Sequence, residues 1–580
     1  MAFSDISARS HQIPNLPDTT NGAICVSRLS RIEVGTVALI FILLLGLKWF
    51  YVGNQLWDSD EPQHLHVVWA WANGLLPYRD VFDNHAPLFQ AMSASIFPLL
   101  GERADIVMCM RWTMLPIDVL FFVLLYRLGT RLFSPRIGLW GTLIAATFPD
   151  LYFKLGEYRP DLFWAALWLL ILNILTGGDL RPRRLFAAGV TCGFAFAVSM
   201  KTAFLLLIIL VAGAVTWFLS RLLSGATIQG DGDNPGRQVV QGIFALIGGI
   251  LIVPLLVVAF FASQGALGQF YSYVITYNLM PSDDLWSRLV ARTRDTRFWL
   301  FIFTLSGGWW LVKQDKNREI SLRRLFFFSV VGFFCTILFS FWPLVSKQDY
   351  IPFYPIVSLA IAVPLVMLAE RFQRFLPAFA LPALVAVGEL ASLVSGHPPL
   401  KKTNQENVQL IADALRLTHP GETVLDAKGQ TIFRPRPYFY NFEQITRERV
   451  EQGKLSDDSP QHLVAARTPV VVRSHWLTSA TADFISQNYI SVGLLMVLGK
   501  RLPSTQDGKL QFEIVIPEKY AIVNEKGFLT GTLDGIAFDG SRDLGPGHHE
   551  LVLNSPTDSV VVLWARAVER GFSPFRPVQN

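Results

Sequence analysis

The sequence predicts a polytopic α-helical membrane protein with a separate polar region after residue 397. Of its 580 residues, 51% are hydrophobic and only 16% are charged, whereas soluble proteins usually carry about a quarter charged residues. The deficit is concentrated in long apolar runs that alternate with short polar loops. Such runs are typical of membrane-spanning helices.

Apolar runs of about 17–25 residues are long enough to cross a bilayer as helices. About eleven such runs are expected, with boundaries uncertain by a few residues. The shortest of them, 162–176 and 298–312, must include flanking residues to cross. The expected spans are 34–53, 105–126, 137–153, 162–176, 185–200, 203–220, 239–262, 298–312, 325–344, 350–369 and 375–396.

Basic residues gather in every second loop between these spans, with one exception: the loop 263–297 contains Arg288, Arg292, Arg294 and Arg297. Loops rich in Arg and Lys stay in the cytoplasm, so the alternation predicts a cytoplasmic N-terminus and an inner-membrane, multi-pass protein. The net charge of +5 is modest and does not indicate a nucleic-acid partner. The segments expected on the outer face are 54–104, 154–161, the turn at Lys201, 263–297, 345–349 and everything after 397.

The chain divides into four expected regions. Strand-like and helix-like patterns alternate after residue 397, and strands with glycine turns follow from about residue 511. None of the four cysteines lies after Cys335, so a disulfide framework is not expected there. The regions are a cytoplasmic tail (1–33), a transmembrane domain (34–396) with a first external loop (54–104), a periplasmic α/β region (397–510) and a small periplasmic β module (511–580).

The first external loop is unusually rich in titratable and aromatic side chains. It contains "DSDEPQHLHVVWAWANG", which has apolar residues at helical spacing and predicts a helix along the membrane surface. Asp60 and Glu61 lie at the start of this helix. "PYRD" and "DNHAPLF" follow, and they predict a turn that leads into a second surface helix.

Five motifs in chain order resemble those of the GT-C glycosyltransferases. The first is the Asp-Glu pair with "PYRD" and "DNHAPLF"; the others are "MRWTMLPIDVLFF", "EYRPDLFW", "FAVSMKTAFL" and "SKQDYIPFYP". The resemblance covers residues 34–370 and is greatest to the branch of protein O-mannosyltransferases and lipid A aminoarabinose transferases. In many members Lys and Pro stand where this chain has His85 and Ala86. The region after 397 matches no family that we can name.

The resemblance implies a GT-C fold and a glycosyl transfer. These enzymes take one sugar from a polyprenyl-phosphate lipid and move it to an acceptor on the outer face, usually with inversion at the anomeric carbon. The acceptor expected here is a cell-envelope glycan, the saccharide of lipid A or its core, or a protein. The departing polyprenyl phosphate keeps its charge, so it needs cations rather than a proton.

Residues at the expected outer ends of the spans fit this chemistry. Asp60 and Glu61 are the candidate catalytic carboxylates, since an acceptor hydroxyl needs a base or a carboxylate-held metal ion. A divalent metal at Asp60 stays open. The residues expected to bind the donor phosphate are Arg159, Lys201, Lys347, Tyr350 and His85. Those expected near the acceptor or in a substrate-binding loop are Asp83, Arg111, Asp161, Arg288 and Arg292.

Plainer interpretations exist for several of these residues. Asp60 fits a solvated loop acid, and Glu61 fits a helix-capping acid. Arg111 and Asp118 lie inside an expected span, where charged groups are functional by default but also balance one another. The spacing of His64, His66 and His85 does not indicate a zinc site.

Two other classes of protein share part of this pattern. A transporter or flippase of lipid-linked sugars would place charged groups near the bilayer midplane and often shows inverted repeats. This chain gathers its acids at one surface and shows no repeat, which favours the enzyme. A polymerase of lipid-linked saccharides would share the donor and the topology, and only the short motifs above argue against it.

Overall fold

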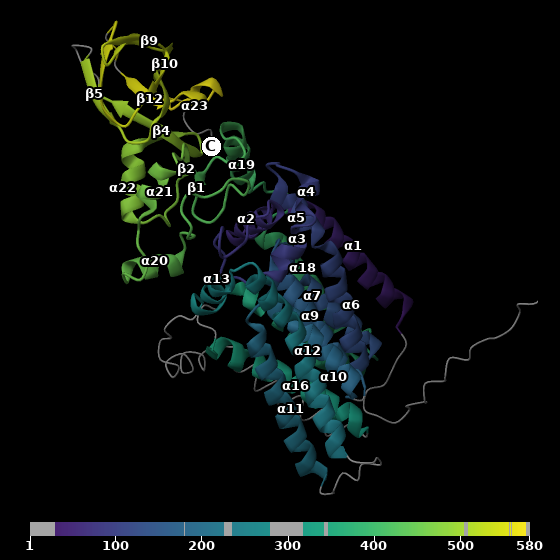
Figure 1. Cartoon of the computed structure of the whole chain (residues 1–580). Helices are drawn as coiled ribbons and strands as arrows, with labels where there is room; N and C mark the ends of the chain where they lie inside the picture. The colour runs from purple at the N-terminus through teal and green to yellow at the C-terminus, as the bar shows by residue number, and fades with distance from the viewer. Residues whose placement is uncertain are drawn as a thin grey trace, which may run out of the picture.

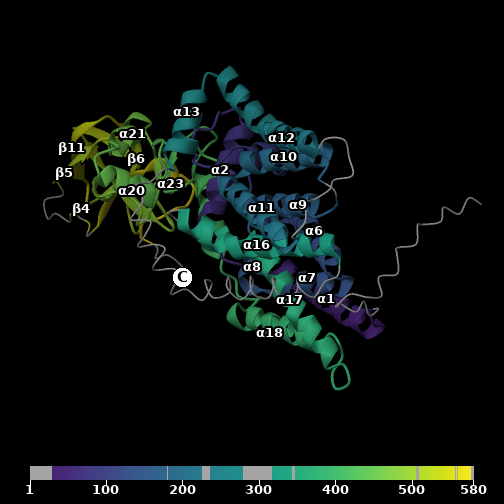
Figure 2. The ribbon, with the colours of Figure 1, turned by 90° about the horizontal axis from the view of Figure 1, so that it is seen from below.

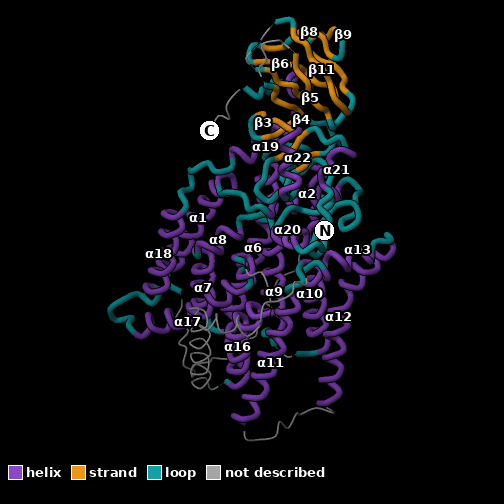
Figure 3. Tube along the Cα trace, turned by 90° about the vertical axis from the view of Figure 1, so that its left-hand side faces the viewer, coloured by secondary structure: helices purple, strands orange, loops and turns teal. Residues whose placement is uncertain are grey.

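The structure is a computed structural model that describes residues 29–178, 180–224, 235–278, 317–341, 346–503, 509–555, 557 and 559–575. Helices form an elongated bundle, and the strands lie together beyond one end of it (Figures 1 and 3). Figure 2 looks along the bundle from below and shows the C-terminal domain to one side of its axis. This is a helical membrane domain followed by a domain that contains the sheets, as the sequence predicts.

Six helical segments in the described ranges are long and apolar enough to cross a membrane. One of them, Ile106–Leu132, is divided at Met114 into α5 and α6. Long apolar helices satisfy their backbone hydrogen bonds internally, which a bilayer requires. The helices are α1 (Arg31–Asn54), α5 (Ile106–Thr113) with α6 (Leu115–Leu132), α11 (Thr202–Ser224), α12 (Pro235–Ser263), α16 (Arg318–Phe341) and α17 (Phe353–Arg371).

The remaining expected spans are shorter helices, so the count of about eleven stays a prediction. Proline stands in the first turn of four of them, where its missing N–H costs nothing and marks a helix start. The bend between α8 and α9 is 110°. The expected span 298–312 lies outside the described residues. The shorter helices are α7 (Pro135–Thr147), α8 (Pro149–Leu155), α9 (Pro160–Leu175), α10 (Pro182–Val198) and α18 (Ala380–Gly396).

Close packing of α10 against α12 fixes the end of α10 that reaches the site described below. A Cβ atom at Gly189 would lie 2.3 Å from the carbonyl oxygen of Leu246, and one at Gly249 would lie 2.5 Å from that of Phe186. Small residues of this kind allow helix backbones to approach within a membrane. The two glycines therefore hold the turn after α10 in place.

Short helices cover the end of the bundle that faces the sheets. The main one, α2, was expected along the membrane surface, but the C-terminal domain covers it from the other side. Its His66 ring lies 2.9 Å from the carbonyl oxygen of Ile432, and a Cβ atom at Gly429 would lie 2.6 Å from the Cβ of His66. The short elements are α2 (Asp60–Ala72), α3 (Leu88–Ser93), α4 (Phe97–Leu100), α13 (Leu267–Tyr271) with η1 (Ser272–Thr276), and η2 (Lys347–Tyr350).

The C-terminal domain contains two sheets. The first has the order β1-β2-β4-β12-β6-β10, with β3 beside β4 and β7 beside β6; the second has the order β5-β11-β8-β9. Among the described strands, β1 and β2 are the one pair that runs in parallel, and the first sheet runs continuously across the expected boundary at residues 510 and 511. Helices α19 (Gln405–Leu417), α20 (Gln444–Glu451), α21 (Ser459–Ala465), α22 (Ser479–Asn488) and α23 (Ala565–Glu569) complete the domain.

The strands are short and mostly apolar on the buried face. Alternation of apolar and polar residues is clear in β5, where every second side chain is buried. The strands are β1 (Val424–Leu425), β2 (Val470–Val472), β3 (Tyr489–Val492), β4 (Leu495–Leu502), β5 (Lys509–Ile514), β6 (Glu518–Asn524), β7 (Gly527–Phe528), β8 (Thr530–Leu533), β9 (Ile536–Asp539), β10 (Ser541–Leu544), β11 (Gly547–Leu553) and β12 (Val560–Trp564).

Candidate active site

A cavity of about 530 Å³ lies between the end of the bundle and the C-terminal domain. Its walls come from six segments that are far apart in the sequence. They correspond to the six segments that the sequence predicts on the outer face, together with a few flanking residues. Five predicted site residues line the cavity: Asp60, His85, Arg159, Asp161 and Lys201. The other polar or charged lining residues are His64, Asn84, Ser199, Asn278, Ser346, Gln348 and Gln444.

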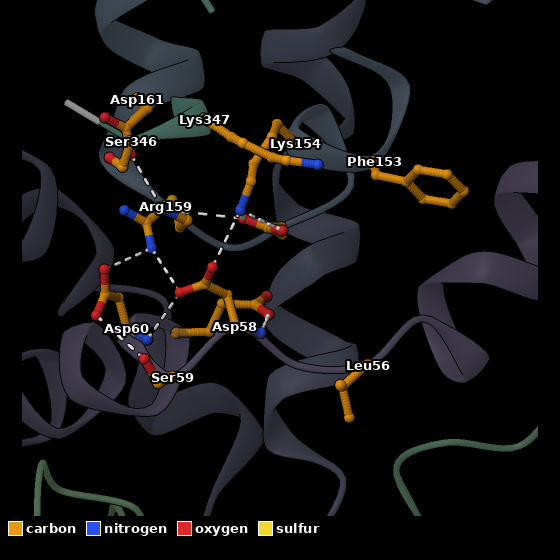
Figure 4. Close-up of polar contacts among 12 residues, drawn as sticks. Leu56, Asp58, Ser59, Asp60, Phe153, Lys154, Arg159, Asp161, Ser346 and Lys347 are labelled. Carbon is orange, nitrogen blue, oxygen red and sulfur yellow. Dashed lines mark hydrogen bonds and ion pairs between the residues drawn. The ribbon is translucent and has the colours of Figure 1, made fainter. Parts of the chain in front are cut away.

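Asp60 begins α2 and is held by cations from two directions. The Nη1 atom of Arg159 donates to Asp60 Oδ2 at 2.7 Å and to Asp58 Oδ1 at 2.8 Å (Figure 4). Lys428, from the C-terminal domain, donates to Asp60 Oδ1 at 2.7 Å. Lys154 holds the other oxygen of Asp58 at 3.0 Å. The first external loop, the α8–α9 turn and the C-terminal domain therefore meet at one carboxylate.

These cations keep Asp60 ionised. Burial alone would raise the pKa of Asp60, but the charges of Arg159 and Lys428 hold it well below its usual value. Both oxygens of Asp60 contact cations, and the described residues contain no group of three or more His, Cys, Asp or Glu arranged to hold a metal. A divalent metal at Asp60 stays a prediction. The carboxylate retains unused lone pairs and 21% of its side-chain surface is exposed.

Glu61 points away from the cavity. Its carboxylate accepts hydrogen bonds from Arg111 at 2.8 and 2.6 Å, and both side chains are fully buried. The backbone N–H groups of Tyr158 and Asp58 also donate to it, at 2.7 and 3.0 Å. Glu61 thus ties α2 to α5 and to the α8–α9 turn, and Arg111 lies beneath the cavity rather than in it. These contacts favour a positioning role for both residues.

The cations that line the cavity with Asp60 are themselves paired with acids. Arg159 Nε donates to Asp161 Oδ2 at 3.1 Å. Lys201, in the turn between α10 and α11, forms an ion pair with Asp349 in η2. Burial alone would lower the pKa of Lys201, but Asp349 and Asp161 raise it. The cavity wall therefore presents two fixed positive charges to whatever enters it.

His85 forms another wall of the cavity. Its Nδ1 lies 2.8 Å from Asp83 Oδ1, and its backbone N–H donates to the same oxygen at 3.1 Å. Partial burial alone would lower the pKa of His85, but the hydrogen bond and charge of Asp83 raise it. The ring of His64 packs edge-on at 4.6 Å, and burial with the charge of His85 lowers the pKa of His64 well below its usual value. Of the two rings, His85 is therefore the one whose surroundings favour the protonated form.

The other sequence-predicted residues lie elsewhere. Lys347 is 71% exposed and pairs with Asp150 at 3.0 Å, although its neighbours Ser346 and Gln348 line the cavity (Figure 4). Tyr350 is half-buried and stacks on Tyr354. Arg288 and Arg292 lie outside the described residues.

Four residues of the site were not predicted from the sequence. Asp58 stands two positions before Asp60, and its place in the same acidic stretch is the sequence signal that could have identified it. His64 lies one helical turn after Asp60, a spacing that places both on one face of α2. Lys428 and Glu443, whose nearest N–O distance is 3.6 Å, come from the C-terminal domain, and no sequence pattern indicates that they return to residue 60.

The sequence itself matches no protein-family model and no curated protein. Among solved structures, the chain is similar to ArnT from Cupriavidus metallidurans in two crystal structures, one bound and one apo. The form bound to undecaprenyl phosphate gives a TM-score of 0.54 at 14% identity and the apo form 0.53 at 12%; each match covers 80% of this chain and 98% of ArnT. The Archaeoglobus fulgidus oligosaccharyltransferase with Zn and sulfate gives 0.46 at 10% identity, covering 90% of this chain and 96% of that one. The chain therefore shares its fold, of the GT-C type, with ArnT.

Proposed function

We propose that the protein is a membrane glycosyltransferase that moves one sugar from a polyprenyl-phosphate donor to an acceptor on the outer face of the membrane. The observation that carries the proposal is the cavity in which an ionised carboxylate, Asp60, faces fixed cations at the end of a bundle of apolar helices. The fold adds support, because ArnT has been crystallised with undecaprenyl phosphate.

The donor phosphate fits the cationic side of the cavity. Lys201, Arg159 and His85 come from three different segments, and converging cations stabilise a departing phosphate more than any one of them does. A preorganised set of charges needs little rearrangement as the leaving group gains charge. The membrane helices beneath give a lipid-linked donor direct access to this site.

Asp60 is the proposed base. The acceptor hydroxyl oxygen forms a bond to the anomeric carbon while the bond from that carbon to the phosphate oxygen breaks. The electron pair of the breaking bond stays with the polyprenyl phosphate, and the hydroxyl proton moves to Asp60. This single displacement inverts the anomeric carbon, and it requires the acceptor to enter from the side of Asp60.

The experiment is a comparison of envelope glycolipids from cells with and without the protein. Mass spectrometry should show loss of one sugar residue from one glycan class in the deletion strain, with its polyprenyl-phosphate donor accumulating. Wild-type protein should restore the product. A deletion strain whose lipid-linked sugars collect on the inner rather than the outer face of the membrane would instead identify a flippase. Accumulation of single repeat units would identify a polymerase.

The orientation is part of the proposal. The cavity is lined by segments that alternate with the basic loops assigned to the cytoplasm, and this alternation, to which the Arg-containing loop 263–297 is an exception, favours an outer location for the cavity and for the C-terminal domain. A tag placed after residue 580 should be accessible to an impermeant label in spheroplasts. Labelling only in inverted vesicles would reverse this orientation.

A further inference from the structure

A second, larger hollow lies on the C-terminal domain, directly beside the candidate active site. It is a groove of about 1190 Å³, bounded by the segment after β1, the segment after β2, helix α22 and strands β3 and β4. Its volume is somewhat above the range found for ligand-binding pockets, about 300–1,000 Å³. The groove is large enough for several sugar rings rather than for one.

The groove lies where ligands bind in α/β sheets. β1 and β2 are parallel, with Val424 opposite Val470. Ligands in such sheets bind outside the carboxyl ends of the parallel strands. Lys428 follows β1 and Arg473 follows β2, and both line the groove.

The walls of the groove are cationic and aromatic. The cations are Lys428, Arg473, Lys500 and Arg501, and the lining acid is Asp483. Glu513 interacts electrostatically with Lys500, and Arg501 donates to the carbonyl oxygen of Pro574 at 2.7 Å.

Arg473 and Trp476 are the wall residues best placed to contact a ligand. Arg473 is exposed, and within the described part of the chain it has no hydrogen-bond or ion-pair partner. The rings of His475 and Trp476 pack together at 4.9 Å, with Trp476 half-buried against the core of the domain. A rigid aromatic face beside a guanidinium suits a sugar ring that carries an anionic group.

The groove and the active-site cavity meet at two residues. Ser59 lines the groove and the next residue, Asp60, lines the cavity. Lys428 lines the groove and bonds to Asp60 at 2.7 Å. The groove and the active-site cavity therefore adjoin at the Asp60 carboxylate.

From this geometry we infer that the groove binds the acceptor, and that the acceptor is a saccharide bearing phosphate or carboxylate groups. The inference rests on the proposed glycosyl transfer, because only a transferase has an acceptor. Binding of an anionic saccharide to the groove is independent of catalysis. Arg473 and Trp476 hold the chain, and its terminal hydroxyl extends past Ser59 to Asp60.

The test measures binding to the purified full-length protein in detergent with two soluble probes, trigalacturonate and maltotriose. They match in length and differ in charge. The wild type should bind trigalacturonate at least about tenfold more tightly than maltotriose, since about 1.4 kcal/mol corresponds to tenfold. Arg473→Ala should remove most of this preference, Arg473→Glu should abolish it, and Arg473→Lys should restore part of it.

Lys526→Ala is the matched control. Lys526 is an exposed cation in the turn between β6 and β7 of the same domain and does not line the groove. Its loss should leave binding unchanged. Equal affinity for the two trisaccharides, or equal losses in the Arg473 and Lys526 variants, would overturn the inference.

Two further arms separate the alternatives. Glycerol 3-phosphate, the headgroup unit of anionic phospholipids, should not displace trigalacturonate at equal concentration; if it does, the cations serve lipid contact and the inference is overturned. Asp60→Asn should keep trigalacturonate binding while losing transfer in cells. Transfer that survives Asp60→Asn contradicts the proposed catalytic role of Asp60. Loss of the preference for trigalacturonate contradicts only the inference that the groove binds an anionic saccharide.

Discussion

Buried charges occur in two regions of this molecule, and they differ in what can reach them. Within the bundle, Arg136 bonds to Glu33 and Glu370 at 2.8 and 2.7 Å, and Trp140 also donates to Glu33. At the end of the bundle, Asp60 has a comparable set of cations but lines a cavity. The same pairing holds helices together in one place and leaves a carboxylate available to a ligand in the other.

Asp60 and Glu61 show the same difference between two adjacent residues. Successive residues on a helix point about 100° apart, so the start of α2 directs Asp60 into the cavity and Glu61 into the bundle. An ion pair that is closed to ligands affects stability when it is broken, and one that borders a cavity affects function. The predictions below test this separation.

The largest expected effect is on the rate of transfer. Asp60→Asn keeps the size of the side chain but removes the base, so transfer should fall by about 10²–10⁴-fold, the usual contribution of a positioned base. The melting temperature should fall less than in a variant that breaks the Glu61–Arg111 pair, because Arg159 keeps Asp58 and Asp161 as partners and Lys428 keeps Glu443. Asp80→Asn, an exposed acid of the same loop that pairs with Arg79, is the control. Full transfer by a well-inserted Asp60→Asn protein would contradict the role of Asp60.

Glu61→Gln should reverse the pattern. Breaking a buried ion pair leaves Arg111 uncompensated, which costs about 3–5 kcal/mol of stability. Thermal unfolding in detergent should show a clear loss, with activity falling in proportion to the folded fraction. An unchanged melting temperature combined with lost transfer would instead make Glu61 a catalytic residue.

Lys201 and Lys347 offer a matched pair of basic residues. Lys201→Ala should weaken donor use by about tenfold to a hundredfold, because one charge-assisted contact to phosphate is lost. Lys347→Ala should have little effect, since this side chain is 71% exposed and pairs with Asp150. The apparent KM for a polyprenyl-phosphate sugar measures both. Equal effects of the two substitutions would show that the donor occupies a different surface.

The smallest expected effect is a change in pH dependence. Partial burial lowers the pKa of His85, but Asp83, Asp60 and Glu443 raise it above its usual value. His85 is therefore charged at low pH, and its contribution to phosphate binding is lost as the pH rises through its pKa. His85→Lys should move the loss of donor affinity to higher pH, because the ordinary pKa of lysine is about 10.4. An unchanged profile would separate His85 from the donor.

The sequence predicts those parts of the site that depend on helix ends. Arg159 and Lys201 each adjoin the start of an apolar helix, so topology alone placed them on one side of the membrane. Lys347 also lies near the start of an apolar helix, but its side chain does not line the cavity. The 3₁₀ turn Lys347–Tyr350 directs Ser346 and Gln348 to the cavity, and orientation within one short turn has no periodic signal in the sequence.

The sequence does not predict the contacts that depend on domain packing. Lys428 is 368 positions from Asp60 along the chain, and nothing in "DAKGQT" indicates a membrane-proximal partner. The same packing turned α2 from an expected surface helix into a covered one. Its apolar residues at helical spacing predicted a helix correctly, but they could not distinguish contact with lipid from contact with another domain.

The contact between Gly429 and His66 has a consequence for protein engineering. Gly429 has a φ of +77°, and a Cβ atom there would collide with the imidazole of α2. This turn places Lys428 against Asp60, so the membrane domain does not contain the whole candidate active site by itself. Chimeras that exchange the soluble domain should therefore keep residues 426–446 with their native α2, and glycine at 429 is the position that such a graft must preserve.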